Sequence, residues 1–515
     1  MGAGMAIRAR CRPRQRVDWA AWALAGVGLG VYLVLTLAQW HRQVSPSLDL
    51  AIFEQAVKGY ASFGPPVVDL KGPGVIQLGD HFSPVLVLLA PFYLLFPSPV
   101  TLLVAQCFLV ALSVVPVATV ARRRLGGWLG ICVGVAYALS WGLQTGVDAQ
   151  FHEYAFAVPM LAFALAAALD QRWRAAALWA AATLTVKEDM GLTVLAFGAV
   201  MAVHGWWRQR QGRAGGGAPG WVARRTPGQG APALGQEAPG PETPRTWRSE
   251  FRIGMALTAA GALAMILILG VVIPAFRHGD WFYWEKLGGN GGALGLIVGV
   301  LSPPIKLRTL LLVTAVVGGA CWFSRWSLVA LPTLAWRFAS TDPAHWGTTW
   351  HYSMILMPVI FLAAVDAWGR WKRSKRVWVR AVPPLMVAVI TAFAVVALWW
   401  FPLGGLFNPA TYRAPTRAAQ VSEVLEAIPP GSTVATDRGL VTRLATDYTV
   451  YWLGDYASEV QPDYVLIDPA SGWRVDPGPV EAYAESVYGG RYEPVGGIGP
   501  PNDPWAYRLA RRLPG

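Results

Sequence analysis

Long apolar segments separated by short basic loops run through most of this sequence. The first extends from Trp19 to about Ala38 and follows a tail, residues 1–18, that carries five arginines. About 20 apolar residues are enough to cross a hydrocarbon layer of about 30 Å. The segment is longer than a signal-peptide core and lacks a clear cleavage site, so it predicts an uncleaved first span. Since basic residues favour the cytoplasmic side, we expect the tail in the cytoplasm and residues 41–80 outside.

The next apolar segment, residues 82–96, differs from a span in length and composition. It reads FSPVLVLLAPFYLLF and contains two prolines, and it is short for a membrane crossing. If it crossed, the basic triplet 122–124 would lie outside, against the preference of basic loops for the cytoplasm. We therefore expect a re-entrant or interfacial segment within an outer loop that covers residues 41–99.

The remaining apolar segments alternate consistently with their loops. Loops predicted to be cytoplasmic are basic, as in GRWKRSKRVWVR at 369–380. Together with the first span they predict about eleven spans, a cytoplasmic N-terminus and an outer C-terminus. The later spans are expected at 100–121, 126–143, 153–169, 173–187, 190–206, 252–275, 309–323, 326–339, 351–368 and 381–402.

Two regions depart from the membrane pattern that covers residues 19–403. Residues 207–250 are rich in Gly, Pro and Ala and hold few large apolar residues, so we expect a disordered cytoplasmic loop. In residues 404–515, short apolar runs alternate with helix-like stretches, which predicts a small extracytoplasmic α/β domain. The runs and stretches lie at 414–428, 432–436, 448–453, 463–468, 480–489 and 505–509.

Composition supports a multi-pass protein of the cell membrane and excludes several other classes. The AVILMFWYC set makes up 54% of the chain, and charged residues make up 14%, against about 25% in soluble proteins. The net charge of +13 comes mainly from arginines in short loops, so the lipid bilayer, and no nucleic acid, is the expected partner. The 26 Trp suit membrane–water interfaces, and the four cysteines lack metal-ligand spacing.

Acids and histidines collect in the predicted outer loops. Ionisable groups near the bilayer are costly and are candidates for a functional site, although outer loops are also polar because they meet water. A short amphipathic helix is predicted over 48–64 from the helical spacing of Leu50, Phe53, Val57 and Tyr60. Asp49 and Glu54 on this helix are site candidates. The alternative is an interfacial helix on which Asp49 is only the N-cap.

The sharpest local signal is TVKEDMGLTV at 185–194. The apolar stretch before it has about a dozen residues, or about 18 Å of helix, whereas the hydrocarbon layer measures about 30 Å. Lys187, Glu188 and Asp189 are therefore expected below the outer surface, where a cation beside two acids should be paired and line a cavity. The alternative is a tight turn in which Asp189 caps the next helix.

Several other polar residues are candidates for substrate binding, each with a structural alternative. Asp80 and His81 in GDHFSP could orient a general base or bind a metal ion, or they could merely cap a helix. Glu153 would be favourable at a helix N-terminus without any function, and a lone histidine is often structural. No cofactor is identified, and a divalent cation stays open. The remaining candidates are His152, Glu153, Lys286 and His351.

With these segments assembled, the chain resembles a large bacterial and archaeal family of predicted membrane proteins, domain-of-unknown-function family 2079. The resemblance is carried by LDLAIFEQAV, LGDHFSPVLVLLAPFYLLFPSP, FHEYAFAVPMLAFAL, TVKEDMGL and WHYSMILMPVIFLAA, together with VATDRGL and PDYVLID. The layout is similar to that of C-type glycosyltransferases, which have a first span, a long outer loop with an acid, and then many spans. That resemblance implies a lipid-phosphate-linked sugar as donor and an acid of the first outer loop as general base.

Three functions are compatible with the sequence. The first is an outer-face glycosyltransferase that uses a polyprenyl-phosphate sugar, with Asp49 as the base and Lys187, Lys286 or Arg277 holding the phosphate. The second is a transporter or lipid flippase, which would favour repeats and paired broken helices at mid-membrane. The third is a non-catalytic scaffold that presents the outer domain to partners. The skew of polar groups to one face favours surface chemistry.

Overall fold

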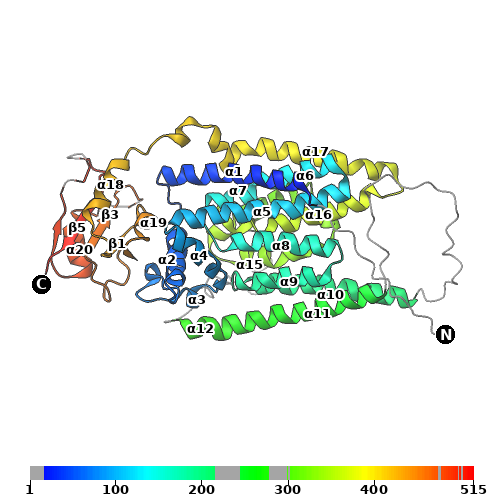
Figure 1. Ribbon diagram of the computed structural model, residues 1–515, viewed down its shortest axis with the longest axis horizontal. Coiled ribbons are helices and arrows are strands. Elements are labelled where there is room, and N and C mark those ends of the chain that lie inside the picture. The colour runs from blue at the N-terminus through cyan, green and yellow to red at the C-terminus, as the bar shows by residue number, and fades with distance from the viewer. Residues whose placement is uncertain are drawn as a thin grey trace, which may run out of the picture.

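Helices that run nearly parallel to one another form the body of the molecule, and a small sheet domain lies at one end of them (Figure 1). The computed structural model describes residues 17–214, 244–277, 299, 302–471, 473, 477–496, 498–499 and 503–514. The N-terminal end of the described chain and the sheet domain lie at opposite ends of the helical body in the same view.

Seven segments of the described chain are long and apolar enough to cross a membrane. They are Trp19–His41, Pro99–Leu125, Gly127–Asp148, Met190–Gln211, Trp247–Phe276, His351–Lys372 and Val377–Trp400. All seven overlap spans expected from the sequence. The helices of this body are α1 (Trp19–His41), α5 (Pro99–Leu125), α6 (Gly127–Ala138), α7 (Trp141–Asp148), α8 (Tyr154–Leu169), α9 (Trp173–Ala182), α10 (Met190–Ala214), α11 (Pro244–Leu267), α12 (Ile273–Phe276), α14 (Pro304–Ala315), α15 (Leu331–Ala339), α16 (Leu356–Lys372) and α17 (Val377–Ala397).

Four of the expected spans contain helices that are shorter than a full crossing. Helices α8, α9, α14 and α15 have 16, 10, 12 and 9 residues, so the count of about eleven spans stays a prediction. Polar residues form the C-caps of three of them: Asp170 for α8, Thr183 for α9 and Ser340 for α15. Gly318 and Gly319 follow α14 with φ angles of +56° and +72°. Such angles do not continue a right-handed helix, so a helix cannot extend past these two residues.

Helices α10 and α11 form an antiparallel pair that extends beyond the bounds expected from the sequence. The bounds predicted for the disordered loop, 207–250, are wrong at both ends, because α10 continues to Ala214 and α11 begins at Pro244. Glycines bring the two backbones together: a Cβ on Gly198 would lie 2.4 Å from the Thr258 nitrogen, and one on Gly254 would lie 2.4 Å from the Ala202 nitrogen. The middle of the predicted loop, 215–243, lies outside the described residues.

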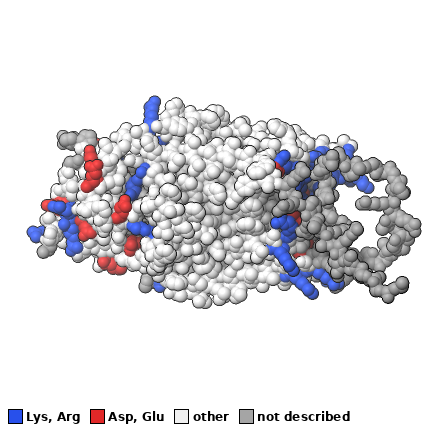
Figure 2. Space-filling view, viewed as in Figure 1, with Lys and Arg blue, Asp and Glu red and all other residues white. Residues whose placement is uncertain are grey.

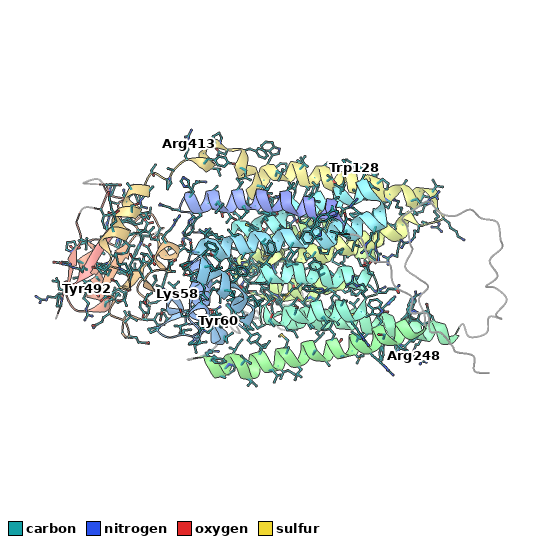
Figure 3. The ribbon with its side chains drawn as sticks, viewed as in Figure 1. Lys58, Tyr60, Trp128, Arg248, Arg413 and Tyr492 are labelled. Carbon is teal, nitrogen blue, oxygen red and sulfur yellow. The ribbon has the colours of Figure 1, made fainter. Side chains whose placement is uncertain are left out.

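Short helices of the first outer loop lie between the helical body and the sheet domain (Figure 1). They are α2 (Asp49–Ala61), α3 (Gln77–Asp80) and α4 (Ala90–Leu95). The alternative of an interfacial α2 is wrong, because residues 50–57 are buried all around the helix. The physical reason is that the C-terminal domain covers its polar face. The Gln55 amide donates to the Val450 carbonyl at 3.1 Å, and Lys58 Nζ donates to the Thr446 carbonyl at 2.6 Å (Figure 3).

The apolar segment predicted to be re-entrant forms two short helical pieces at this end of the molecule. A 3-10 helix, Pro84–Leu89, leads into α4, and both pack against α2. Together they span 12 residues. Pro91 lies in the first turn of α4, where a backbone N–H has no acceptor within the helix, so its absence costs no helical hydrogen bond.

The C-terminal domain is a five-stranded sheet in its described part, with strand order β2-β1-β3-β5-β4. Strand β1 is parallel to both of its neighbours, β2 and β3, whereas β5 is antiparallel to both β3 and β4. The expected α/β domain is confirmed, although no apolar run predicted β4, which has only three residues. The elements are α18 (Ala418–Ala427), β1 (Thr433–Thr436), α19 (Val441–Leu444), β2 (Thr449–Trp452), β3 (Tyr464–Ile467), α20 (Val480–Tyr488), β4 (Tyr492–Pro494) and β5 (Arg508–Arg512).

Charged side chains are absent from the middle of the molecular face seen in Figure 2. Lys and Arg gather at the end away from the sheet domain, and the sheet-domain end carries both signs. An uncharged belt between two charged ends is the surface that a bilayer-spanning protein presents to lipid. The blue end includes Arg248 on α11, which Figure 3 labels.

Candidate functional site

A polar cavity of about 400 Å³ lies where the outer loops meet the helical body. Segments far apart in the sequence build it: α2, the 71–81 loop, the starts of α8 and α10, and the chain around α15 and α16. Its lining combines acids, lysines and histidines with apolar side chains. The residues are Asp49, Ile52, Phe53, Lys71, Gln77, His81, His152, Glu153, Tyr154, Lys187, Glu188, Asp189, Leu192, Met265, Leu269, Trp336, Ser340, Asp342, His345, His351 and Tyr352.

Asp49 begins α2 and faces two stacked imidazole rings. Its Oδ2 lies 3.1 Å from His152 Nε2, and His152 Nδ1 lies 3.1 Å from the Gln150 carbonyl. The imidazole of His152 thus lies between the Asp49 carboxylate and the Gln150 carbonyl, which hold its orientation. Burial opposes the charge on Asp49, but His152 outweighs it and holds the pKa of this carboxyl below its usual range. The ring of His351 stacks on His152, with centroids 3.5 Å apart.

The expected role of Asp49 as an N-cap is not seen. The N-cap of α2 is Leu48, which makes no side-chain capping bond, and Asp49 is the first residue within the helix. A carboxylate in the first turn still interacts favourably with the helix dipole. Its side chain retains 40% exposure, whereas that of His152 retains 3%. Asp49 is therefore held by the histidine and remains open to the cavity.

Lys187 crosses the cavity to the start of α8. Its Nζ donates to Glu153 Oε1 at 2.7 Å and lies 5.1 Å from the centre of the Tyr154 ring. The Glu153 side chain is fully buried, and that of Lys187 is 13% exposed. A lysine at this depth is stable only if it is paired, which the short apolar stretch before it led us to expect.

Glu188 connects the same turn to the first outer loop. Its Oε1 lies 2.8 Å from His81 Nδ1, and its Oε2 accepts from the Phe82 backbone nitrogen at 3.1 Å. Burial opposes ionisation of Glu188, but His81 and then Lys187 lower its pKa. Burial and the neighbouring Glu188 instead raise the pKa of Asp189 to about 7. The pKa values of two adjacent carboxyls are therefore shifted in opposite directions.

The structure brings most of the predicted site residues together in this cavity, and two described ones, Asp80 and Glu54, do not line it. Asp80 lies just behind the lining and pairs with Lys71 at 3.2 Å. Glu54 faces the C-terminal domain instead of the cavity, as described below. Lys286 lies outside the described residues. The predicted outer loop that contains Lys286 therefore supplies no described lysine to the cavity.

Sequence reasoning missed several lining residues and gives no clear metal site. Lys71, Gln77 and Trp336 lie in none of the quoted motifs, although Lys71 lies in the same outer loop as Asp49 and Asp80, and Tyr154 lies in FHEYAFAVPMLAFAL but was not predicted as a site residue. Within the parts of the chain that the structure describes, no group of three or more His, Cys, Asp or Glu is arranged to hold a metal ion. The chemistry available from the described side chains is proton transfer and the binding of polar, anionic or hydroxylated groups.

Glu54 lies at the contact between α2 and the C-terminal domain. Its Oε1 accepts from Tyr93 Oη at 2.8 Å and from Thr446 Oγ1 at 2.5 Å. Burial raises the pKa of this carboxyl to about 7, although both hydrogen bonds and Lys58 act in the other direction. Folding therefore favours the protonated form of Glu54 relative to the unfolded chain.

Glu54→Gln is expected to flatten the dependence of stability on pH. The wild-type stabilisation by a neutral Glu54 is complete below the ordinary pKa of 4.5 and is lost as the pH rises through about 7, because the unfolded chain ionises first. Thermal unfolding in detergent between pH 5 and pH 8 measures this. The wild type should lose more stability over that interval than the variant, and equal losses would contradict the assignment.

Most of this chain matches a known family of membrane proteins. Residues 41–496 match the model of a family described as predicted membrane protein (DUF2079). No curated protein sequence matches the chain.

Solved structures give the fold class. The crystal structure of ArnT from Cupriavidus metallidurans bound to undecaprenyl phosphate is similar to this chain with a TM-score of 0.52 and 11% identity, over 97% of this chain and 99% of ArnT. Its apo form gives 0.51 and 11%, over 96% and 97%. The archaeal oligosaccharyltransferase AglB from Archaeoglobus fulgidus, in complex with an inhibitory peptide and a dolichol-phosphate, gives 0.42 and 10%, over 92% and 71%. The chain thus has the C-type glycosyltransferase fold expected from the sequence.

Proposed function

We propose that this chain, which belongs to the DUF2079 family of predicted membrane proteins, transfers a sugar from a polyprenyl-phosphate donor to an acceptor on the outer face of the membrane. The observation that carries the proposal is the cavity itself, which joins an accessible carboxylate, a buried lysine and an apolar wall in a C-type glycosyltransferase fold. ArnT was crystallised with a lipid of the proposed donor class, undecaprenyl phosphate. Fold alone does not define a reaction, so the argument rests on the side chains.

Asp49 is the carboxylate of this cavity best suited to act as general base. Glu153 is fully buried against Lys187, and the side chain of Glu188 is only 9% exposed and is held by His81. Asp49 is 40% exposed, and its carboxylate can accept the proton of an acceptor hydroxyl as that hydroxyl attacks the donor. In this proposal His152 is a positioning residue that fixes the carboxylate.

Lys187 and Lys71 are the described cations that would meet the donor phosphate. Both line the cavity, and both have carboxylate partners that fix their positions, Glu153 and Asp80. Leu192, Met265 and Leu269 form an apolar part of the lining on α10 and along the α11 segment. An isoprenoid chain could leave the cavity along these residues, because α11 exposes apolar side chains to the lipid.

A transporter or a scaffold is less well supported by the described residues. A transporter would place its polar site near mid-membrane between related halves. The cavity here is lined by residues of α2, and α2 lies next to the C-terminal domain (Figure 1). A scaffold offers no reason to bury Lys187, Glu153 and Glu188 at one site.

Cysteine labelling tests the membrane orientation on which the proposal depends. Ser458→Cys in the C-terminal domain should react with an impermeant maleimide added to intact cells, whereas Lys375→Cys after α16 should react only after the membrane is opened. Both positions are polar, and Ser458 and Lys375 are exposed. The reverse pattern would place the cavity on the cytoplasmic side and refute outer-face transfer.

A further inference from the structure

A second polar cleft, of about 260 Å³, lies between the C-terminal domain and the chain that follows α1. Three arginines and one carboxylate line it, which gives a formal charge of +2. The lining comprises Arg42, Gln43, Ser45, Pro415, Thr416, Arg417, Arg438, Gly439, Asp468, Ala470, Ser471 and Tyr507. None of these residues lines the cavity that contains Asp49, so the cleft is a separate feature.

Arg417 is fixed in this cleft by two contacts that leave part of its hydrogen-bonding capacity unused. Its Nη1 donates to Asp468 Oδ1 at 2.7 Å, and its guanidinium lies 3.8 Å from the centre of the Tyr507 ring. The Nε and Nη2 groups are buried and have no acceptor among the described residues. A buried donor without an acceptor is unfavourable, so an anion in the cleft would be stabilised by accepting hydrogen bonds from these two groups.

The other two arginines of the cleft are exposed. Arg42 and Arg438 make no ion pair with any described residue, although they line one cleft with Arg417. Like charges brought together without acids between them repel one another, and a bound anion removes that repulsion. Guanidinium groups also match the oxygen geometry of phosphate better than an ammonium group does.

The wall of the cleft is formed by the loops that follow two parallel strands, β1 and β3. The Asp437 carboxylate joins these loops, because it accepts from the Gly439 nitrogen at 3.2 Å and from the Asp468 nitrogen at 2.9 Å. A Cβ on Gly439 would lie 2.2 Å from Asp468 Oδ2, so only glycine fits there. The carboxyl ends of parallel strands are the edge at which open α/β sheets bind ligands.

The position of the cleft fits the depth of lipid headgroups. Arg42 follows the end of α1 directly, and the guanidinium of Arg443 lies 3.5 Å from the centre of the Trp40 ring. Tryptophan near the end of a span is typical of the membrane–water interface. The C-terminal domain therefore holds the arginine cleft beside the lipid surface.

We propose that this arginine cleft binds a phosphate ester, supplied either by an anionic phospholipid headgroup or by a soluble phosphate compound. Arg42 and Arg438 supply charge from the two sides of the cleft, and Arg417 supplies oriented donors at its floor. The bound phosphate would link the membrane domain to the C-terminal domain, because its ligands come from both. This proposal is independent of sugar transfer, since it uses none of the residues assigned to that reaction.

The test compares Arg42→Gln/Arg438→Gln with wild type, using the full-length protein in phosphatidylcholine nanodiscs. The control is Arg413→Gln/Arg491→Gln, which removes the same charge from exposed positions outside the lining (Figure 3 labels Arg413). Calorimetric titration with inorganic phosphate measures the soluble source. Retention of phosphatidylglycerol, counted by native mass spectrometry from nanodiscs that contain it, measures the lipid source.

We expect wild type and control to bind at least one of the two probes, and the cleft variant to bind it about tenfold more weakly. Loss confined to phosphatidylglycerol identifies a headgroup site, and loss of inorganic phosphate identifies a soluble ligand. Both substituted arginines are exposed and unpaired in the described chain, so the variant should unfold at the wild-type temperature. Equal binding by the variant and the control, or no binding by wild type, would overturn the proposal.

Discussion

Asp49→Asn is expected to lower sugar transfer by about 10²–10⁴-fold, the usual contribution of a positioned general base. Asparagine keeps the size of the side chain and can still hydrogen-bond to His152, but it cannot accept a proton from a hydroxyl. Stability should fall, because the variant loses the attraction of the Asp49 charge to His152 and to the first turn of α2, while the hydrogen bond to His152 can remain. The measurement is release of polyprenyl phosphate from a panel of polyprenyl-phosphate sugars.

Asp69→Asn provides the matched control for this variant. Asp69 lies in the same outer loop and its Oδ1 accepts from the Gly74 nitrogen at 3.1 Å, but it does not line the cavity. The control should therefore retain wild-type transfer. Full activity of a correctly folded Asp49→Asn protein would remove Asp49 from the catalytic role.

Glu153→Gln is expected to lower the free energy of unfolding by about 3–5 kcal/mol, the range seen when one partner of a buried ion pair is removed. Glu153 is fully buried and is bonded to Lys187 at 2.7 Å, so its loss leaves a buried ammonium group with fewer acids around it. Chemical unfolding in mixed micelles measures the change. Activity should fall as well, since Lys187 is then free to leave its position.

The double variant Glu153→Gln/Lys187→Met separates the ion pair from general damage to packing. Removal of both charges should restore much of the lost stability, because no uncompensated charge remains. It should not restore transfer, since Lys187 is proposed to meet the donor phosphate. A double variant as unstable as the sum of its single variants would show that the pair makes no special contribution.

The sequence predicted the long helices better than the short ones. Apolar length and basic loops identify α1, α5 and α17 because each signal is local to its own segment. Helices α9, α14 and α15 are too short to cross by themselves, and the apolar runs that contain them do not reveal where each helix breaks. The break after α14 depends on two glycines with positive φ, which sequence alone does not mark as a helix end.

Site residues were predictable as a set, whereas their partners were not. The apolar stretch before Lys187 is too short to cross the hydrocarbon layer, and this predicted that residues 187–189 would lie below the outer surface. Such a prediction needs only the spacing of residues along the sequence. That Lys187 pairs with Glu153, and Glu188 with His81, depends on how α8 and the first outer loop pack. The helical period of α2 likewise could not reveal that the C-terminal domain covers its polar face.

The most direct test of the account is the structure of the full-length protein in nanodiscs that contain a polyprenyl phosphate. The account predicts phosphate density in the cavity, in contact with Lys187 and facing the Asp49 carboxylate, with the isoprenoid chain leaving past Met265 and Leu269. A phosphate bound only in the arginine cleft, or a cavity without phosphate at saturating lipid, would contradict it.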